Sequence, residues 1–177
     1  MQQRLSRRSF LTITGATLAG LIGGAVAAGE VTSPVPGKRV ALSGYDPIGY
    51  FTKGEPVKGS SEFWFAFDDT VYFFASAQHR AMFVEDPERY APQYDGFCTM
   101  ALSALATKLE PDPEAWVIHE GRLYVFGKKL GAEKFKESPD VIADKANAAW
   151  PSVRGVPTVC RLVDPTQEAM VLDCKTQ

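Results

Sequence analysis

The strongest constraint on the fold is an aromatic stretch near the middle of the chain, SEFWFAFDDTVYFFAS. Phe63, Phe65 and Phe67 stand at every second position, the period that puts side chains on one face of a β-strand. An Asp-Asp pair then favours a turn, and residues 71–74 form a second strand-like run. The stretch therefore predicts an aromatic β-hairpin.

Two further hairpins are expected later in the chain. In EAWVIHEGRLYVFG, Glu120 and Gly121 make a two-residue turn between strands at 116–119 and 123–126. The last segment, TVCRLVDPTQEAMVLDC, predicts a hairpin that turns near Asp164. No internal repeat and no low-complexity tract is visible, so we expect one compact domain.

Helices are expected between these hairpins. Ser76 fits the N-cap of a helix in SAQHRAMFVEDPERY, and Asp46 fits the cap of a turn or short helix that begins with the next residue, a proline. The Ala and Leu content of GFCTMALSALATK favours a helix there. Two more helices are predicted at 131–137 and 139–149, the second ended by Pro151. Because hairpins and helices do not alternate as β-α-β units, we expect an α+β fold, a small single domain of β-hairpins packed against short helices.

The N-terminus resembles an export signal. The segment SRRSFL, in which paired arginines precede a Phe-Leu step, is similar to the twin-arginine signal, and a Gly- and Ala-rich apolar stretch follows it. Ala25 and Ala27 fit the A-x-A pattern of a cleavage site. We therefore expect residues 1–28 to be a twin-arginine signal peptide and not a permanent membrane anchor. The mature protein is then periplasmic, and the twin-arginine export machinery is one of its partners.

The charge of the mature chain argues against one class of partner. Without residues 1–28 the basic residues fall from 19 to 16, against 21 acidic ones, which leaves a net charge of −5. Proteins that bind nucleic acid present a basic face to the phosphates, so we expect no nucleic-acid partner. About 149 residues remain, which suits one domain with a sizeable core.

Several segments together resemble the YHS-domain family in its exported form. They are GYDPIGYF, KGSSEF, VYFFASAQHRAMFVEDPERYAPQYDGFC and, later, DPEAW, GRLYV and ANAAWP, in this order and spacing. The similarity covers residues 40–153, the expected YHS-like domain. Residues 29–39, with their prolines and glycines, are expected to be a linker, and residues 154–177 a C-terminal hairpin tail. The resemblance implies a small α+β module that binds a heavy metal such as copper and has no established reaction.

The resemblance also points to particular residues. The positions that match the family pattern are Tyr45, Asp46, Tyr50, Phe51, Pro87, Tyr90 and Cys98. A thiolate is a soft ligand that suits copper or zinc, and an imidazole can complete such a site, so Cys98 and His79 are the leading ligand pair. Two ligands are too few for zinc. Further ligands are therefore sought among Tyr45, Asp46, Met82 and Met100.

Three roles stay open for Cys98. It is a small buried apolar residue, as free cysteines often are, or a metal or cofactor ligand, or a disulfide partner or reactive thiol. A nucleophilic role needs a base within reach, for which His79 and His119 are the candidates. The tight turn beside His119 favours an exposed hairpin residue instead.

Cys160 and Cys174 are expected to form a disulfide. Export delivers them to an oxidising space, where such a bond persists. They flank the last predicted hairpin, in which a loop at 165–169 sets them opposite each other. Cys98 is then the odd cysteine of an exported protein.

These observations lead to three functional hypotheses. The first is a non-enzymatic periplasmic protein that binds copper or zinc through a site centred on Cys98. The second is a redox protein or enzyme whose cofactor is inserted before export, since the twin-arginine route carries folded proteins. The third is a module that binds a periplasmic protein through its loops and needs no metal.

Overall fold

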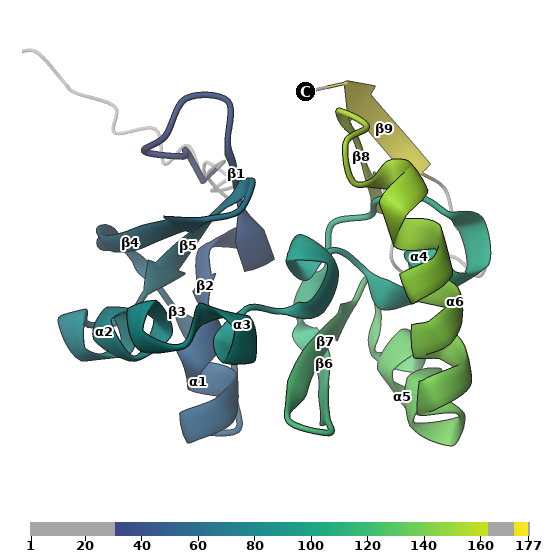
Figure 1. The fold of residues 1–177 in the computed structure, drawn as a ribbon, viewed down its shortest axis with the longest axis horizontal. Coiled ribbons are helices and arrows are strands. Elements are labelled where there is room, and N and C mark those ends of the chain that lie inside the picture. The colour runs from purple at the N-terminus through teal and green to yellow at the C-terminus, as the bar shows by residue number, and fades with distance from the viewer. Residues whose placement is uncertain (1–30, 163–171, 177) are drawn as a thin grey trace, which may run out of the picture. The chain divides into compact units, whose positions relative to one another are not determined.

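The computed structural model describes residues 31–162 and 172–176, which combine short β-sheets with helices (Figure 1). One sheet has three strands and three others have two strands each. The described residues thus form a small α+β domain, which confirms the predicted class. None of the helices in this part of the chain is long and apolar enough to cross a membrane.

The first half of the described chain contains the predicted aromatic hairpin. Its elements in chain order are β1 (Arg39–Val40), the tight turn η1 (Ala41–Gly44), β2 (Tyr45–Asp46), α1 (Pro47–Thr52), β3 (Val57–Lys58), β4 (Ser60–Phe67), β5 (Thr70–Phe74), α2 (Ala77–Glu85) and α3 (Pro87–Tyr90). Strands β4 and β5 pair antiparallel, and β1 joins β5 in parallel. Both predicted N-caps are confirmed, because Asp46 accepts the backbone N–H of Ile48 in α1 and Ser76 accepts that of His79 in α2.

The second half contains the two other predicted hairpins. Its elements are η2 (Gln93–Gly96), α4 (Thr99–Leu105), β6 (Asp112–His119), β7 (Arg122–Phe126), α5 (Lys129–Glu137), α6 (Pro139–Val153), β8 (Thr158–Leu162) and β9 (Leu172–Thr176). One prediction is wrong: α6 does not end at Pro151 but continues for two more residues. Because this proline lies in the last turn, it removes a single backbone hydrogen bond at a point where the helix is about to stop.

The two halves are copies of one motif, 52 residues apart. At this offset β4 matches β6, β5 matches β7 and α2 matches α5, each at both its first and its last residue. The strand registers agree as well, because both ladders are irregular just before an equivalent tryptophan, Trp64 in β4 and Trp116 in β6. We call residues 39–90 the first repeat and residues 91–142 the second repeat.

This duplication corrects the expectation that the chain has no internal repeat. Only eight of the 52 positions carry the same residue in both copies, too few to be visible in a single sequence. They are Gly44 and Gly96, Glu62 and Glu114, Trp64 and Trp116, Tyr72 and Tyr124, Phe74 and Phe126, Phe83 and Phe135, Glu85 and Glu137, and Pro87 and Pro139. The three pairs that begin with Tyr72, Phe74 and Phe83 are buried in both copies. What the copies share is therefore mainly an aromatic core.

Both repeats begin with the same left-handed turn. The three residues 42–44 have φ values of 54°, 51° and 78°, and the equivalent residues 94–96 have 57°, 54° and 77°. Glycine adopts this conformation without steric cost. The requirement explains why Gly44 and Gly96 are among the few residues that the two copies share.

The repeats pack against each other through the hairpin of the second copy. Along β7, Tyr124 and Phe126 enter the core of their own repeat, whereas Leu123 and Val125 enter the core of the first repeat. In Figure 1 this hairpin lies between the first repeat and helices α4, α5 and α6. Tandem units that cannot bury their apolar faces alone gain stability from such stacking.

Segments outside the repeats cover the two remaining apolar faces. In β5, Val71 and Phe73 are equivalent to Leu123 and Val125 of β7. They pack against Val31 and Val35 of the N-terminal segment. At the other end, the long helix α6 and strand β8 contribute to the core of the second repeat. Both ends of the two-repeat stack are thereby capped.

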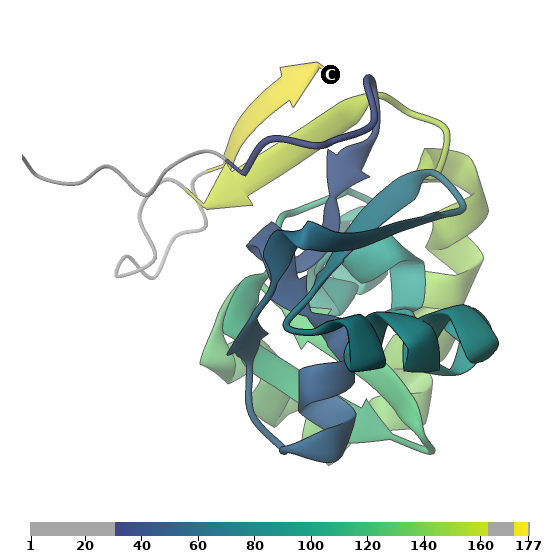
Figure 2. The same cartoon turned by 90° about the vertical axis from the view of Figure 1, so that its left-hand side faces the viewer.

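The C-terminal hairpin carries the disulfide. Strands β8 and β9 pair antiparallel (Figure 2). Cys160 stands opposite Cys174 in this ladder, and the two cysteines are bonded, as predicted. The predicted loop at 165–169 lies outside the described residues.

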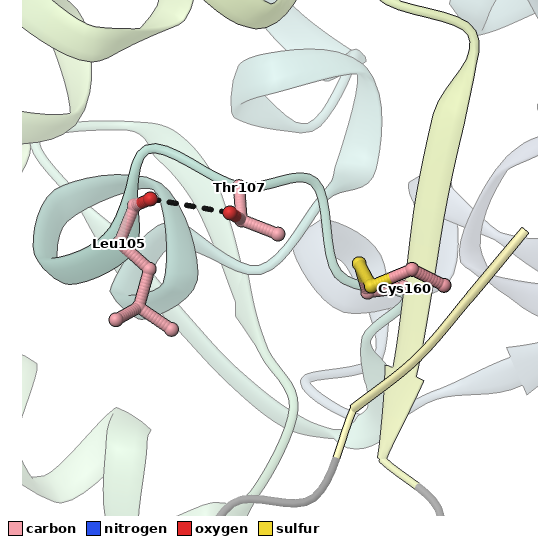
Figure 3. The surroundings of a disulfide bond; sticks show 4 residues. Leu105, Thr107 and Cys160 are labelled. Carbon is pink, nitrogen blue, oxygen red and sulfur yellow. Dashed lines mark hydrogen bonds between the residues drawn. A yellow bond between two sulfur atoms is a disulfide. The ribbon is translucent and has the colours of Figure 1, made fainter. Parts of the chain in front are cut away.

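Cys160 also ties this hairpin to the second repeat. Its backbone N–H donates to the carbonyl of Lys108, and its carbonyl accepts from the N–H of Glu110, both at 2.8 Å. Figure 3 shows Cys160 beside the segment that follows α4, where the Thr107 hydroxyl donates to the Leu105 carbonyl. The disulfide therefore holds β9 to a strand that is itself anchored in the domain.

Candidate functional site

The duplication places two equivalent sites in the molecule, one in each repeat. Each is formed by the residue before α1 or α4 and by the first turn of α2 or α5. In the first repeat these residues are Asp46 and His79, and in the second they are Cys98 and Gly131. Comparison of the two sites shows how the second one differs from the first.

Asp46 is the centre of the first site. Its side chain is fully buried. Oδ1 accepts the backbone N–H of Ile48, and Oδ2 accepts that of Ala75, both at 2.8 Å, while Nδ1 of His79 lies 2.6 Å from Oδ2. A buried carboxylate must be paired and hydrogen-bonded to be tolerated, and here the protein supplies every partner. The first site is therefore closed.

The histidine of the first site is held from two sides. The Ser76 hydroxyl accepts the backbone N–H of His79 at 3.1 Å, and Asp46 holds its ring through Nδ1. Only 16% of the His79 side chain is exposed. The ring therefore fills the space beside the carboxylate and has a fixed orientation.

Cys98 takes the place of Asp46 in the second site. Its Sγ accepts the backbone N–H of Gly127 at 3.1 Å, and Gly127 is equivalent to Ala75, which serves Asp46 in the same way. The thiol is free and buried, so Cys98 is not a disulfide partner. Burial raises the pKa of the Cys98 thiol, although backbone N–H groups partly offset this effect. The thiol is therefore protonated near neutral pH and is a weak nucleophile.

Two further differences distinguish the second site from the first. Gly131 stands where His79 fills the first site, so no imidazole lies against the sulfur. Lys128 stands where Ser76 caps α2, and its side chain makes no cap hydrogen bond to α5. An acid, an imidazole and a hydroxyl have thus been replaced by a thiol, a hydrogen and an ammonium group.

The space beside Cys98 is a pocket of about 230 Å³. It lies between α4 and α5 and is lined by Cys98, Met100, Ala101, Ala104, Leu109, Gly127, Lys128, Leu130, Gly131 and Lys134. These residues include two sulfur atoms and two lysines but no histidine and no carboxylate. Leu130 at the rim is 56% exposed, so apolar surface continues out of the pocket. The pocket can hold a small, largely apolar ligand.

The structure does not bring the predicted ligand pair together. His79 pairs with Asp46 in the first repeat and does not line the Cys98 pocket. Within residues 31–162 and 172–176, no three His, Cys, Asp or Glu side chains are grouped so that they could hold a metal ion. Cys98 and His79 thus form no common site, and a metal role for either one stays a prediction.

The other candidate residues fall into different places. Met100 lines the pocket together with Cys98. Tyr45 lies outside it, with Nζ of Lys58 at 4.4 Å from the centre of its ring. Met82 packs at the edge of the core of the first repeat. Met100 is therefore the one predicted helper that shares a site with Cys98.

His119 is not the exposed hairpin residue that the sequence predicts. Its ring lies 6.0 Å from that of Phe135, and its Nε2 is 3.0 Å from Oδ1 of Asp140. The side chain is 29% exposed. His119 therefore packs against α5 and pairs with α6, and it does not line the Cys98 pocket.

Sequence reasoning missed the residues that shape the pocket. Gly131 attracts no notice as a single glycine, and Lys128 and Lys134 appear as ordinary charges on a helix. The 52-residue offset is the signal that could have found them. Placing the second copy on the first aligns Gly131 with His79 and shows that one site lacks its imidazole.

Comparisons with family models, with curated proteins and with solved structures find no match to this chain. The YHS resemblance therefore rests on the sequence segments that carry it. A function has to be argued from the geometry of the second site.

Proposed function

We propose that the chain is an exported, YHS-like binding protein whose ligand occupies the Cys98 pocket. One observation carries this proposal: Cys98 and Gly131, which stand at the positions of the paired Asp46 and His79 of the first repeat, both line a pocket of about 230 Å³. Concave, mostly apolar sites with a few polar groups are the usual form of small-ligand sites.

Binding without catalysis agrees with the chemistry of the pocket. Burial raises the pKa of the only thiol that lines it, so the nucleophilic thiolate is scarce. The lining residues supply no histidine or carboxylate as a general base. The export-like N-terminus and the disulfide support a periplasmic location for this binding protein.

Ala104→Trp tests whether the pocket holds the ligand. Ala104 is exposed on α4 and lines the pocket, so an indole there covers the opening without altering the core. Leu105→Trp is the matched control, because Leu105 is the next residue of α4, is 47% exposed and does not line the pocket. We expect native mass spectrometry of exported protein to find a bound species in the wild type and in Leu105→Trp but not in Ala104→Trp. The same bound mass in all three proteins, or none in any, contradicts the proposal.

A soft metal ion is the second candidate for the ligand. Cys98 and Met100 line one pocket, and a thiolate with a thioether is the donor set that selects Cu(I). We expect Cys98→Ser to abolish Cu(I) binding, measured by competition with a colorimetric chelator, and Met100→Leu to weaken it about tenfold or more. His79→Gln should leave it unchanged, because His79 lies in the other site. Equal losses in His79→Gln and Cys98→Ser would restore the pair first predicted from the sequence.

The remaining hypotheses have their own readouts. A visible absorption band in freshly exported protein supports a redox cofactor inserted before transport. A pull-down from the periplasm tests the partner-binding module. If the wild type and the Ala104→Trp variant both recover the same periplasmic protein, the module binds its partner without the pocket.

A further inference from the structure

The Cys98 pocket has a charged rim and apolar walls. Lys134 on α5 and Lys128 just before it line the pocket, and none of the lining residues is acidic. The walls include Ala101 and Leu109, both buried, and the rim includes the exposed Leu130. A ligand that matches this surface has a negatively charged group at one end and a hydrocarbon body.

The first repeat shows what the second site has lost. There the carboxylate of Asp46 is buried and receives two backbone N–H groups and the imidazole of His79. The second site keeps backbone N–H donors, with Gly127 in the place of Ala75 and Met100 in that of Ile48, but the acceptor is now a neutral thiol. A lysine replaces the capping serine at the same time. The second site therefore has no carboxylate at the position of Asp46.

Resting on the proposed function, we propose that the Cys98 pocket binds a small aliphatic monocarboxylate. Its carboxylate lies at Lys134, which is exposed on α5, and its chain runs along Ala101 and Leu109. The volume of about 230 Å³ is below the roughly 300–1,000 Å³ of sites for drug-sized ligands, so the chain is short. Affinity should rise about fourfold for each added methylene until the pocket is full.

Hexanoate is the probe, with hexan-1-ol as the neutral molecule of matched length. The signal is the ¹³C-labelled methyl group of Met100, which lines the pocket. We expect hexanoate to cause a saturable shift of this signal. Its affinity for the pocket should be at least about tenfold higher than that of hexan-1-ol, because a lysine ammonium group attracts the charged carboxylate and not the neutral alcohol. Added salt should weaken hexanoate binding and leave hexan-1-ol unchanged.

Lys134→Gln tests the charge contact itself. It should weaken hexanoate binding about fivefold to tenfold and leave hexan-1-ol unaffected. Lys136→Gln is the control, because Lys136 is exposed on the same helix and does not line the pocket. Equal affinity for the two probes, or equal effects of the two lysine variants, overturns the carboxylate assignment and leaves the pocket standing as a binding site. No Met100 shift with either probe also overturns it, and the Ala104→Trp comparison then decides separately whether any ligand is held.

Discussion

Asp46→Ala should lower the free energy of unfolding by about 3–5 kcal/mol, a large part of the roughly 5–15 kcal/mol that stabilises a typical domain. The carboxylate is fully buried and is the shared acceptor of Ile48, Ala75 and His79. Removing it leaves buried donors without partners, and each unpaired group costs about 1–3 kcal/mol. It also removes the N-cap of α1. Urea unfolding followed by circular dichroism measures the loss.

Cys98→Ala is the matched control for this prediction, since Cys98 stands at the equivalent position. Its sulfur accepts the backbone N–H of Gly127 but makes no contact with a polar side chain among the described residues, and it borders a pocket. We expect a loss of about 1 kcal/mol. Equal losses for Asp46→Ala and Cys98→Ala would contradict the view that only the first site is closed by its own polar network.

Phe83→Ala should cost about 3–5 kcal/mol, because it removes a fully buried ring from the centre of the first core. Its ring centre lies 4.9 Å from that of Tyr72 and 5.2 Å from that of Phe74, and two further phenylalanine rings of β4 contact it edge-on. The alanine variant leaves a cavity among these four rings, and the cavity adds to the cost of the lost apolar contacts. Thermal and urea unfolding of the variant measure the cost.

Phe135→Ala provides the counterpart in the second repeat. Phe135 is also fully buried, with Tyr124 at 4.7 Å and Phe126 at 5.2 Å between ring centres, so we expect a similar loss. Val84→Ala is the surface control on α2, where the side chain is 43% exposed, and should change stability by less than about 0.5 kcal/mol. A loss below about 1.5 kcal/mol in Phe83→Ala would show that the aromatic cluster does not support the core.

The local elements could be predicted from the sequence because each has a strong local cause. Alternating aromatic residues predict the β4–β5 hairpin, and the capping side chains of Asp46 and Ser76 mark the starts of α1 and α2. The pairing of Cys160 with Cys174 followed from their positions on either side of one hairpin. Each of these sequence signals lies within a single hairpin or at the start of a single helix.

The duplication and the site could not be predicted in the same way. Eight shared residues in 52 leave the repeat hidden, because an aromatic core tolerates many exchanges of apolar residues as long as volume is kept. The hydrogen-bond partner of His79 was missed for a related reason. Proximity along the chain does not show which repeat a side chain faces, and the true partner of His79 is Asp46, 33 residues away.

The central claim is that the Cys98 pocket is the open counterpart of the closed Asp46–His79 site. A double-mutant cycle of Cys98→Asp and Gly131→His tests it by rebuilding the first site in the second repeat. A Cβ on Gly131 meets Met100 Cγ and Phe126 Cβ, each at 3.3 Å. The cycle is best made with Met100→Ile throughout, because the equivalent residues in the first repeat are Ile48 and Phe74, and Phe126 is already the same as Phe74.

The decisive measurement is the free energy of unfolding of the four proteins of this cycle. Cys98→Asp alone should be strongly destabilising, because it buries a carboxylate without its imidazole partner. Adding Gly131→His should recover at least about 1–2 kcal/mol, a favourable coupling between the two substitutions. Simple additivity of the two changes would contradict the equivalence of the two sites, and with it the origin assigned to the pocket.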